Sequence, residues 1–161
     1  MKNTLSLTMI VLFLGCGASA QSNSTVPKWG VEVGSLYFHQ DSGGDTTTVL
    51  PMINAGLWQS GSWDLNAQIG GTVAKGANND DTFSIGVLRL NPLYRFADMP
   101  FSIEGLLGVQ KWEKQDTKVD LGLRGNYLLG HEWVSEIFAA AGSVQLDEVT
   151  NYVTVGLKKW F

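Results

Sequence analysis

Cysteine is almost absent from the 161-residue chain, in which Cys16 is the only one. It lies in an N-terminal segment with a positive start at Lys2, an apolar run over residues 5–17 and a small-x-small exit at residues 18–20. That order is typical of a secretory signal peptide, here residues 1–20, and the run is shorter than the roughly 20 residues that span a bilayer. Sec-type export and cleavage would leave a mature chain, residues 21–161, without a thiol for a disulfide or for nucleophilic catalysis. Lipidation of Cys16 is the alternative that this segment leaves open.

Positive charge is scarce as well. Lys and Arg number 11 against 15 Asp and Glu, and loss of Lys2 with the signal segment takes the formal net charge from −4 to −5. Nucleic-acid-binding domains carry basic patches, so nucleic acid is not an expected partner. After residue 20 the sequence has no apolar run long enough for a transmembrane helix. The mature chain can therefore enter a membrane only as a closed barrel.

Short-period alternation is what the mature chain has in place of long apolar runs. In residues 63–74 the side chains of Trp63, Leu65 and Ile69 alternate with those of Asp64 and Gln68, as in a strand with one apolar and one polar face. The pattern recurs along the chain and predicts one all-β domain, an eight-stranded antiparallel up-and-down transmembrane β-barrel over residues 21–161. The predicted strands are residues 28–39, 47–58, 63–74, 82–96, 101–112, 118–128, 133–144 and 151–161.

Two of these strands are irregular. Residues 47–58 are apolar on both faces and contain Pro51, which cannot donate to a strand ladder. In residues 82–96 the apolar positions change phase between Val87 and Leu88. One extra residue would reverse the two faces, so we predict a β-bulge at that point.

The connections differ in length. We predict tight turns at residues 60–62, 97–100 and 129–132, and longer loops at residues 40–46, 75–81, 113–117 and 145–150. Bacterial outer-membrane barrels have short periplasmic turns and longer extracellular loops. The alternation therefore predicts that the strands begin and end on the periplasmic side.

Aromatic residues gather at one predicted end of every strand. Rings with an apolar body and a polar tip favour a membrane–water interface, whereas a soluble lipocalin-like barrel has no reason to ring one rim with them. The predicted periplasmic belt is Trp29, Trp58, Trp63, Tyr94, Phe96, Phe101, Tyr127, Trp133 and Phe161. A sparser set would mark the outer interface: Tyr37, Trp112 and Tyr152.

Charged residues recur on the polar face, which would line the barrel interior. An eight-stranded barrel is filled by side chains rather than open, and opposite charges in that space can pair. We predict an interior charge network of Glu32, Asp64, Arg89, Glu104, Asp120, Arg124, Glu136 and Lys158. Slow, gated conductance through the same residues is the alternative. Lys111 and Lys159 fall on the lipid side near strand ends, where a long stem can snorkel.

The last strand carries a family resemblance. Residues 151–161, NYVTVGLKKWF, resemble the C-terminal strand of outer-membrane proteins, which ends in Phe and is read by the barrel-assembly machinery, although Lys159 replaces the usual aromatic. The mature chain resembles the small eight-stranded class that includes the OmpA membrane domain and OmpX, and this resemblance implies a salt-bridge network that restricts permeation. Residues 101–112 also resemble lipid A deacylase barrels of the PagL type. The His-x-Ser pair of that class is missing from residues 136–142.

Residues that could do chemistry are few. The only histidines, His39 and His131, fall at opposite ends of the predicted barrel and cannot share a metal ion. His39, beside Asp41, is the one candidate for a catalytic group at the outer surface. Carboxylates of the outer loops could hold divalent cations or form an ordinary solvated rim; they are Asp41, Asp45, Asp80, Asp81, Glu113, Asp116, Asp147 and Glu148, against Lys75 and Lys114. We assign no catalytic residue, no metal and no cofactor.

The resulting functional prediction is a monomeric protein of the bacterial outer membrane with a structural or interaction role in the cell envelope and no enzymatic activity. Its predicted partners are outer-membrane lipid, lipopolysaccharide and the barrel-assembly machinery. Two alternatives stay open: a lipid A-modifying enzyme that uses residues of the outer rim, and a narrow gated channel.

Overall fold

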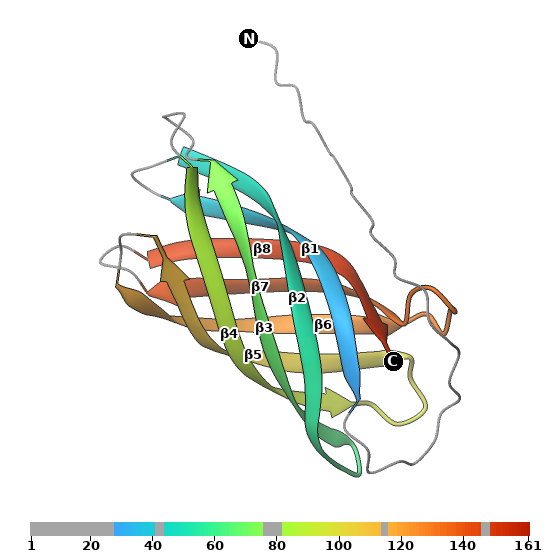
Figure 1. Ribbon diagram of the computed structural model, residues 1–161. Helices are drawn as coiled ribbons and strands as arrows, with labels where there is room; N and C mark the ends of the chain where they lie inside the picture. The colour runs from blue at the N-terminus through green and yellow to red at the C-terminus, as the bar shows by residue number, and fades with distance from the viewer. Residues whose placement is uncertain (1–27, 41–43, 76–81, 114–115, 146–148) are drawn as a thin grey trace.

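Eight strands form a closed barrel in the computed structural model, which describes residues 28–40, 44–75, 82–113, 116–145 and 149–161 (Figure 1). Each strand is antiparallel to its neighbours, and the last strand pairs with the first. The strands are β1 (Trp29–Gln40), β2 (Gly44–Ser60), β3 (Trp63–Lys75), β4 (Thr82–Arg95), β5 (Phe101–Trp112), β6 (Thr117–Leu128), β7 (Glu136–Gln145) and β8 (Val149–Trp160). The predicted eight-stranded antiparallel barrel is confirmed. The signal segment, residues 1–20 with Cys16, lies outside the described residues.

The described residues include no helix that is long and apolar enough to cross a membrane.

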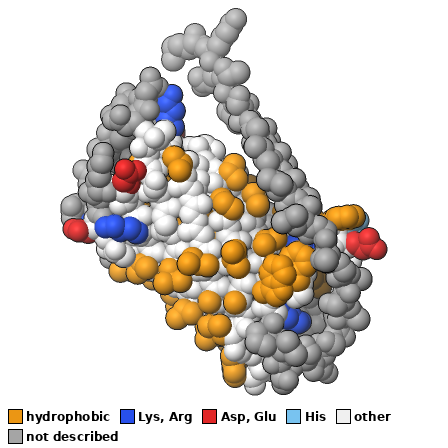
Figure 2. Space-filling model, viewed as in Figure 1, with side chains coloured by type: hydrophobic (Ala, Val, Ile, Leu, Met, Phe, Trp, Pro, Cys, Tyr) orange, Lys and Arg blue, Asp and Glu red, His pale blue; other side chains and the backbone are white. Residues whose placement is uncertain are grey.

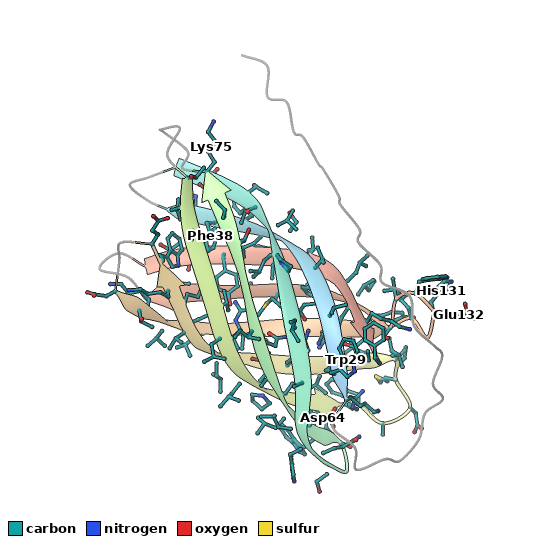
Figure 3. The ribbon with its side chains drawn as sticks, viewed as in Figure 1. Trp29, Phe38, Asp64, Lys75, His131 and Glu132 are labelled. Carbon is teal, nitrogen blue, oxygen red and sulfur yellow. The ribbon has the colours of Figure 1, made fainter. Side chains whose placement is uncertain are left out.

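The even number of strands brings the beginning of β1 and the end of β8 to the same end of the barrel. We call this the terminal end, because it carries Trp29 and Phe161, and the other the distal end. Figure 3 shows Trp29, Asp64 and His131 at the terminal end and Lys75 at the distal end.

Side chains alternate between the interior and the outer wall, as the period of two requires. In β5, for example, Glu104 and Leu106 are buried while Leu107 is 48% exposed. Figure 2 shows a broad field of hydrophobic side chains on the outer wall, and Ile69 and Leu90 on that wall are 58% and 52% exposed. A water-soluble barrel would turn this face inward, so the faces point as in a membrane barrel.

The predicted β-bulge at Val87–Leu88 is wrong, because β4 pairs with β3 without interruption. The change of phase has another cause. Val87 is buried inside the barrel, where much of the distal half of the interior is apolar, whereas Leu88 points outward and is 53% exposed. The register shifts in β2 instead, between Gly56 and Trp58.

The predicted difference in connection length is also wrong. At the terminal end, β6 ends at Leu128 and β7 begins only at Glu136, so the turn is longer than residues 129–132 and contains Trp133. Leu129 N donates to the Ser135 carbonyl at 2.9 Å to close this longer turn. The distal connections, residues 41–43, 76–81, 113–116 and 146–148, are no longer than this one. Connection length therefore gives no orientation for the barrel.

Candidate functional site in the barrel interior

All eight residues of the predicted interior network are inside the barrel and at most 6% exposed. The structure divides them into three groups, one centred on Arg124 and Lys158, one on Arg89, and one at the terminal mouth on Asp64. Together with Arg95 we call them the charged network. In each strand, residues that are an even number of positions apart point to the same face. Each network residue shares the inward face of its own strand in this way.

Arg124 on β6 joins three strands. Its Nη1 and Nη2 donate to the Glu32 carboxylate of β1 at 3.0 and 2.8 Å, and Nη1 lies 3.3 Å from Glu104 Oε2 of β5. The guanidinium carbon is 4.1 Å from the centroid of the Phe138 ring. A two-pronged pair of this kind is geometrically specific as well as strong. It ties β6 to β1 across the interior.

Lys158 on β8 occupies the centre of the remaining carboxylates. Its Nζ lies 3.6 Å from Glu104 Oε2, 3.6 Å from Glu136 Oε2 and 3.9 Å from Glu32 Oε2. Neutral donors add hydrogen bonds to these carboxylates: Gln68 donates to Glu32, Asn91 and Asn126 donate to Glu104, and Trp160 Nε1 donates to Glu136. Among the described residues, Glu136 Oε2 and Lys158 Nζ have no hydrogen bond within 3.5 Å, and they interact through charge alone. Charges removed from water need such partners. The network is therefore a built structure rather than a set of isolated ions.

Arg89, Asp120 and Tyr152 form the second group, nearer the middle of the barrel. Arg89 Nε donates to Asp120 Oδ2 at 2.5 Å, and the Tyr152 hydroxyl donates to Asp120 Oδ1 at 2.8 Å. The ring of Tyr152 fits because Gly142 carries no side chain: a Cβ there would lie 2.5 Å from the Tyr152 hydroxyl oxygen. Tyr152 was predicted at the outer membrane interface, and that prediction is wrong.

Asp64 pairs with Arg95 at the terminal mouth, with Arg95 Nε 2.8 Å from Asp64 Oδ2. The Arg95 side chain is 40% exposed, whereas that of Asp64 is 7% exposed. The predicted network did not include Arg95, although its even spacing from Arg89 places both side chains on the same face of β4, whether or not a bulge precedes them.

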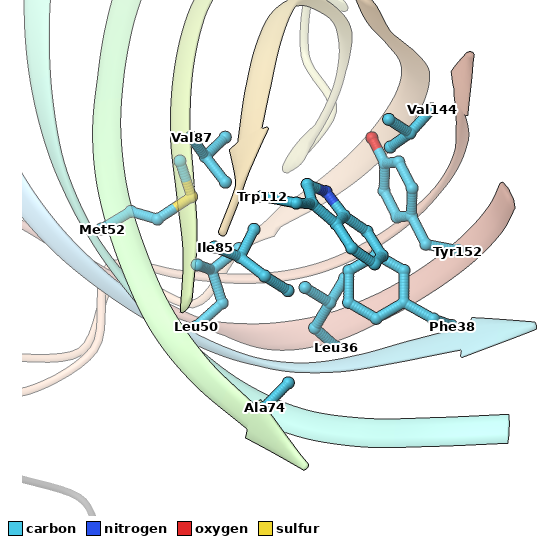
Figure 4. Packing of buried hydrophobic residues seen from close by; sticks show 10 residues of the cluster. All are labelled: Leu36, Phe38, Leu50, Met52, Ala74, Ile85, Val87, Trp112, Val144 and Tyr152. Carbon is cyan, nitrogen blue, oxygen red and sulfur yellow. The ribbon is translucent and has the colours of Figure 1, made fainter. Parts of the chain in front are cut away.

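An apolar cluster occupies much of the distal half of the interior, contrary to the prediction of a polar lining throughout, although Gln110 and Thr150 are also buried there. Figure 4 shows this cluster, which we call the apolar layer. Trp112, predicted at the outer interface, is 3% exposed and belongs to this cluster. The layer consists of Leu36, Phe38, Leu50, Met52, Ala74, Ile85, Val87, Trp112, Val144 and Tyr152, with the partly buried Phe83 packed against it.

The predicted aromatic belt lies at the terminal end. Trp29 stacks on Phe161 with ring centroids 4.3 Å apart, and Phe96 stacks on Phe101 at 5.7 Å. Trp133 lies in the turn before β7 rather than in a strand. The rings that are more than a third exposed are Trp29, Trp58, Trp63, Phe101, Tyr127 and Trp133. Exposed rings at one rim are the arrangement that a membrane interface favours.

The two histidines lie at opposite ends, as predicted. His39 Nδ1 is 2.8 Å from Asp45 Oδ1 at the distal rim, with both side chains more than half exposed, and Tyr37 also hydrogen-bonds Asp45. At the terminal end, His131 Nδ1 accepts from the backbone N of Trp133 at 3.3 Å.

Metal ligation finds no support in the described ranges, which hold no group of three or more His, Cys, Asp or Glu placed for a metal ion. Of the outer-loop residues proposed for cations, Asp45, Glu113 and Asp116 are described. The other carboxylates lie outside the described residues, as does Lys114: Asp41, Asp80, Asp81, Asp147 and Glu148.

Comparison with solved structures gives the class of the fold. The attachment invasion locus protein Ail of Yersinia pestis matches with a TM-score of 0.61 and 15% identity, over 84% of this chain and 97% of Ail. Ail in complex with the heparin analogue sucrose octasulfate gives 0.58 and 16% over the same shares, and Neisserial surface protein A gives 0.59 and 13%, again over 84% and 97%. No family model and no curated protein matches the sequence. The fold is therefore that of the small outer-membrane β-barrels.

Proposed function

We propose that the protein is a monomeric barrel of the bacterial outer membrane with a structural or interaction role in the envelope and without enzymatic activity. The observation that carries this proposal is the filled interior, in which the charged network and the apolar layer follow one another along the lumen. A filled barrel offers no route for solutes. Its role then lies on its surfaces, in the outward apolar wall and the two rims.

Three partners follow from those surfaces. Lipid covers the outward apolar wall, and the polar residues of the distal rim, such as His39 and Asp45, meet the lipopolysaccharide headgroups. The barrel-assembly machinery reads β8 and Phe161 before the barrel closes. In this proposal residues 1–20 direct Sec-type export and are removed, and the terminal end with its aromatic belt faces the periplasm.

The ligand of one structural neighbour does not extend to this chain. Ail was crystallised with sucrose octasulfate, a polyanion. The present chain has a formal net charge of −4, and the described charged residues at the distal end are of both signs, with Lys75, Lys111 and Lys118 as well as Asp45, Glu113 and Asp116. A net negative charge disfavours a polyanionic ligand.

A second candidate function rests on the pair of His39 and Asp45. A carboxylate that fixes one imidazole nitrogen is a common way to orient a general base. The pair is at the rim, at the depth of the headgroups in this orientation, so a lipid A-directed hydrolase is the alternative. We favour the non-enzymatic role, because a cross-strand pair of exposed residues also has a plain structural function in the β1–β2 hairpin.

One experiment separates the two candidates. A strain that lacks the protein is complemented with the parent or with His39→Ala. Two quantities are measured in each strain: the composition of lipid A, by mass spectrometry, and the entry of a hydrophobic dye into the cells. The proposal expects lipid A of one composition in all strains, with dye entry raised in the deletion strain and restored by both proteins. A lipid A species that requires His39 would overturn the non-enzymatic function.

A further inference from the structure

We propose that the apolar layer, and not the charged network, is the barrier that keeps ions from crossing this barrel. The inference rests on the proposed function, a barrel that spans the outer membrane without conducting, and assigns the barrier to particular side chains. Salt-bridge pairs are the feature from which the sequence analysis expected restricted permeation. The structure contains both elements in series, so their contributions can be separated.

Aromatic rings cross the full width of the lumen. In a ring of eight strands β1 lies opposite β5, yet Phe38 of β1 contacts Trp112 of β5 with centroids 5.1 Å apart. The row continues at both sides, because Phe83 of β4 stacks on Trp112 at 5.3 Å and Tyr152 of β8 is 6.3 Å from Phe38. Four rings therefore connect opposite walls of the barrel.

Aliphatic side chains close the space around the rings. Leu36 and Val144 are 0% exposed, and Ile85 is 2% exposed. Among the described residues every strand except β6 contributes to the layer. The indole N–H of Trp112 is satisfied by Gln110 Oε1 at 3.1 Å. Gln110 is itself a buried polar side chain beside the layer, because its backbone pairs with that of Val87. Close-packed protein interiors hold few spaces of water size.

The charged network and the apolar layer differ in the groups that could solvate an ion. Carboxylate, guanidinium and amide groups exchange hydrogen bonds with water, so a charged network that moves slightly can solvate an ion. At its terminal edge the network already meets solvent, because Arg95 is 40% exposed. Apolar side chains offer an ion nothing in place of its water, and a narrow apolar constriction excludes water as well. The highest free-energy barrier to ion permeation therefore lies in the apolar layer.

The test is single-channel recording in planar bilayers with four purified, refolded full-length mature barrels. These are the parent, Phe38→Ala, Arg124→Gln and Phe138→Ala. Phe38→Ala removes the ring that joins β1 to β5. Arg124→Gln removes the central cation of the network. Phe138→Ala is the matched control, because it removes the same side chain from the interior outside the apolar layer. Heat-modifiable gel migration confirms that each variant is folded, and Trp112→Leu, which keeps an apolar residue in place of the ring, replaces Phe38→Ala if that variant does not fold.

We expect the parent, Arg124→Gln and Phe138→Ala to show only the bilayer leak, and Phe38→Ala to show discrete openings at least ten times above it. Conductance in Arg124→Gln together with silence in Phe38→Ala would overturn the inference and assign the barrier to the network. Openings of equal size in Phe38→Ala and Phe138→Ala would also overturn it, since any cavity would then suffice. Openings in the parent would overturn the proposed non-conducting function instead.

Discussion

Trp29 and Phe161 contact each other where β8 pairs with β1 to close the barrel. Their rings stack with centroids 4.3 Å apart and planes at 17°, and Phe161 N donates to the Trp29 carbonyl at 2.9 Å. The contact continues the β1–β8 pairing beyond the last register pair, Gly30 with Trp160. The residue that the assembly machinery is proposed to read thus has a partner within the folded barrel.

A double-mutant cycle measures this contact. We expect Trp29→Ala and Phe161→Ala each to lower the free energy of unfolding in lipid vesicles, with a coupling of about 0.5–1.5 kcal/mol between them, the usual range for a stacked aromatic pair. Unfolding is followed by gel migration over a urea series. Phe101→Ala, which removes another belt ring, is the control in the same cycle with Trp29→Ala, and a coupling as large as that with Phe161 would contradict a specific stack.

Removal of Arg124 leaves two buried carboxylates, Glu32 and Glu104, without their main counter-charge. Loss of one partner of a buried pair costs about 3–5 kcal/mol, so Arg124→Ala is expected to lower the free energy of unfolding by that amount. The control is Lys28→Ala, which removes a cation at an exposed position of the terminal end and is expected to cost about 0.5 kcal/mol or less. Equal losses in urea titrations of the two variants would contradict the buried network.

Alanine substitutions at two glycines compare a crowded position, Gly142, with an open one, Gly86. A Cβ at Gly142 would lie 2.5 Å from both the Leu121 carbonyl oxygen and the Tyr152 hydroxyl, whereas at Gly86 its nearest neighbour would be 3.9 Å away. We expect Gly142→Ala to cost about 1–3 kcal/mol of unfolding free energy through overpacking. Gly86→Ala should be neutral or slightly stabilising, by up to about 1 kcal/mol. Equal effects of the two substitutions would show that Tyr152 is not where the structure places it.

Arginine substitutions on the outer wall of the barrel test whether that wall faces lipid or water. Leu90 is 52% exposed near the middle of β4, and Thr47 is exposed near the distal rim. In a bilayer, Leu90→Arg should cost about 2–4 kcal/mol and Thr47→Arg about 0–1 kcal/mol, because the cost of a cation falls toward the interface. The measurement is equilibrium unfolding from vesicles. A neutral Leu90→Arg would mean that this wall faces water.

Strand periodicity was sufficient to predict the barrel. The alternation in β3, from Trp63 outward and Asp64 inward, correctly located both faces, and the same rule placed all eight charged residues inside. It could not predict which charges pair, because Arg124 and Glu32 are 92 residues apart and meet only when the barrel closes. Pairing depends on the register of every strand between them.

The apolar layer was missed for a physical reason. A regular alternation leads one to expect an interior that is polar along its whole length, and that expectation places Trp112 and Tyr152 on the outer wall. Both rings sit inside, where Gly142 and the neighbouring strands make room for them. An alternation pattern shows that a strand has two different faces. It cannot by itself show that the interior face changes from polar to apolar along the strand. The false bulge in β4 followed from the same expectation.

The central claim, a closed barrel of the outer membrane, is tested most directly by gel migration of the protein in fractionated cell envelopes. We predict that the protein is found in the outer-membrane fraction and runs faster when unheated than after boiling, because the closed barrel stays folded in detergent until heated. Recovery from another fraction, or one mobility before and after boiling, would contradict the account.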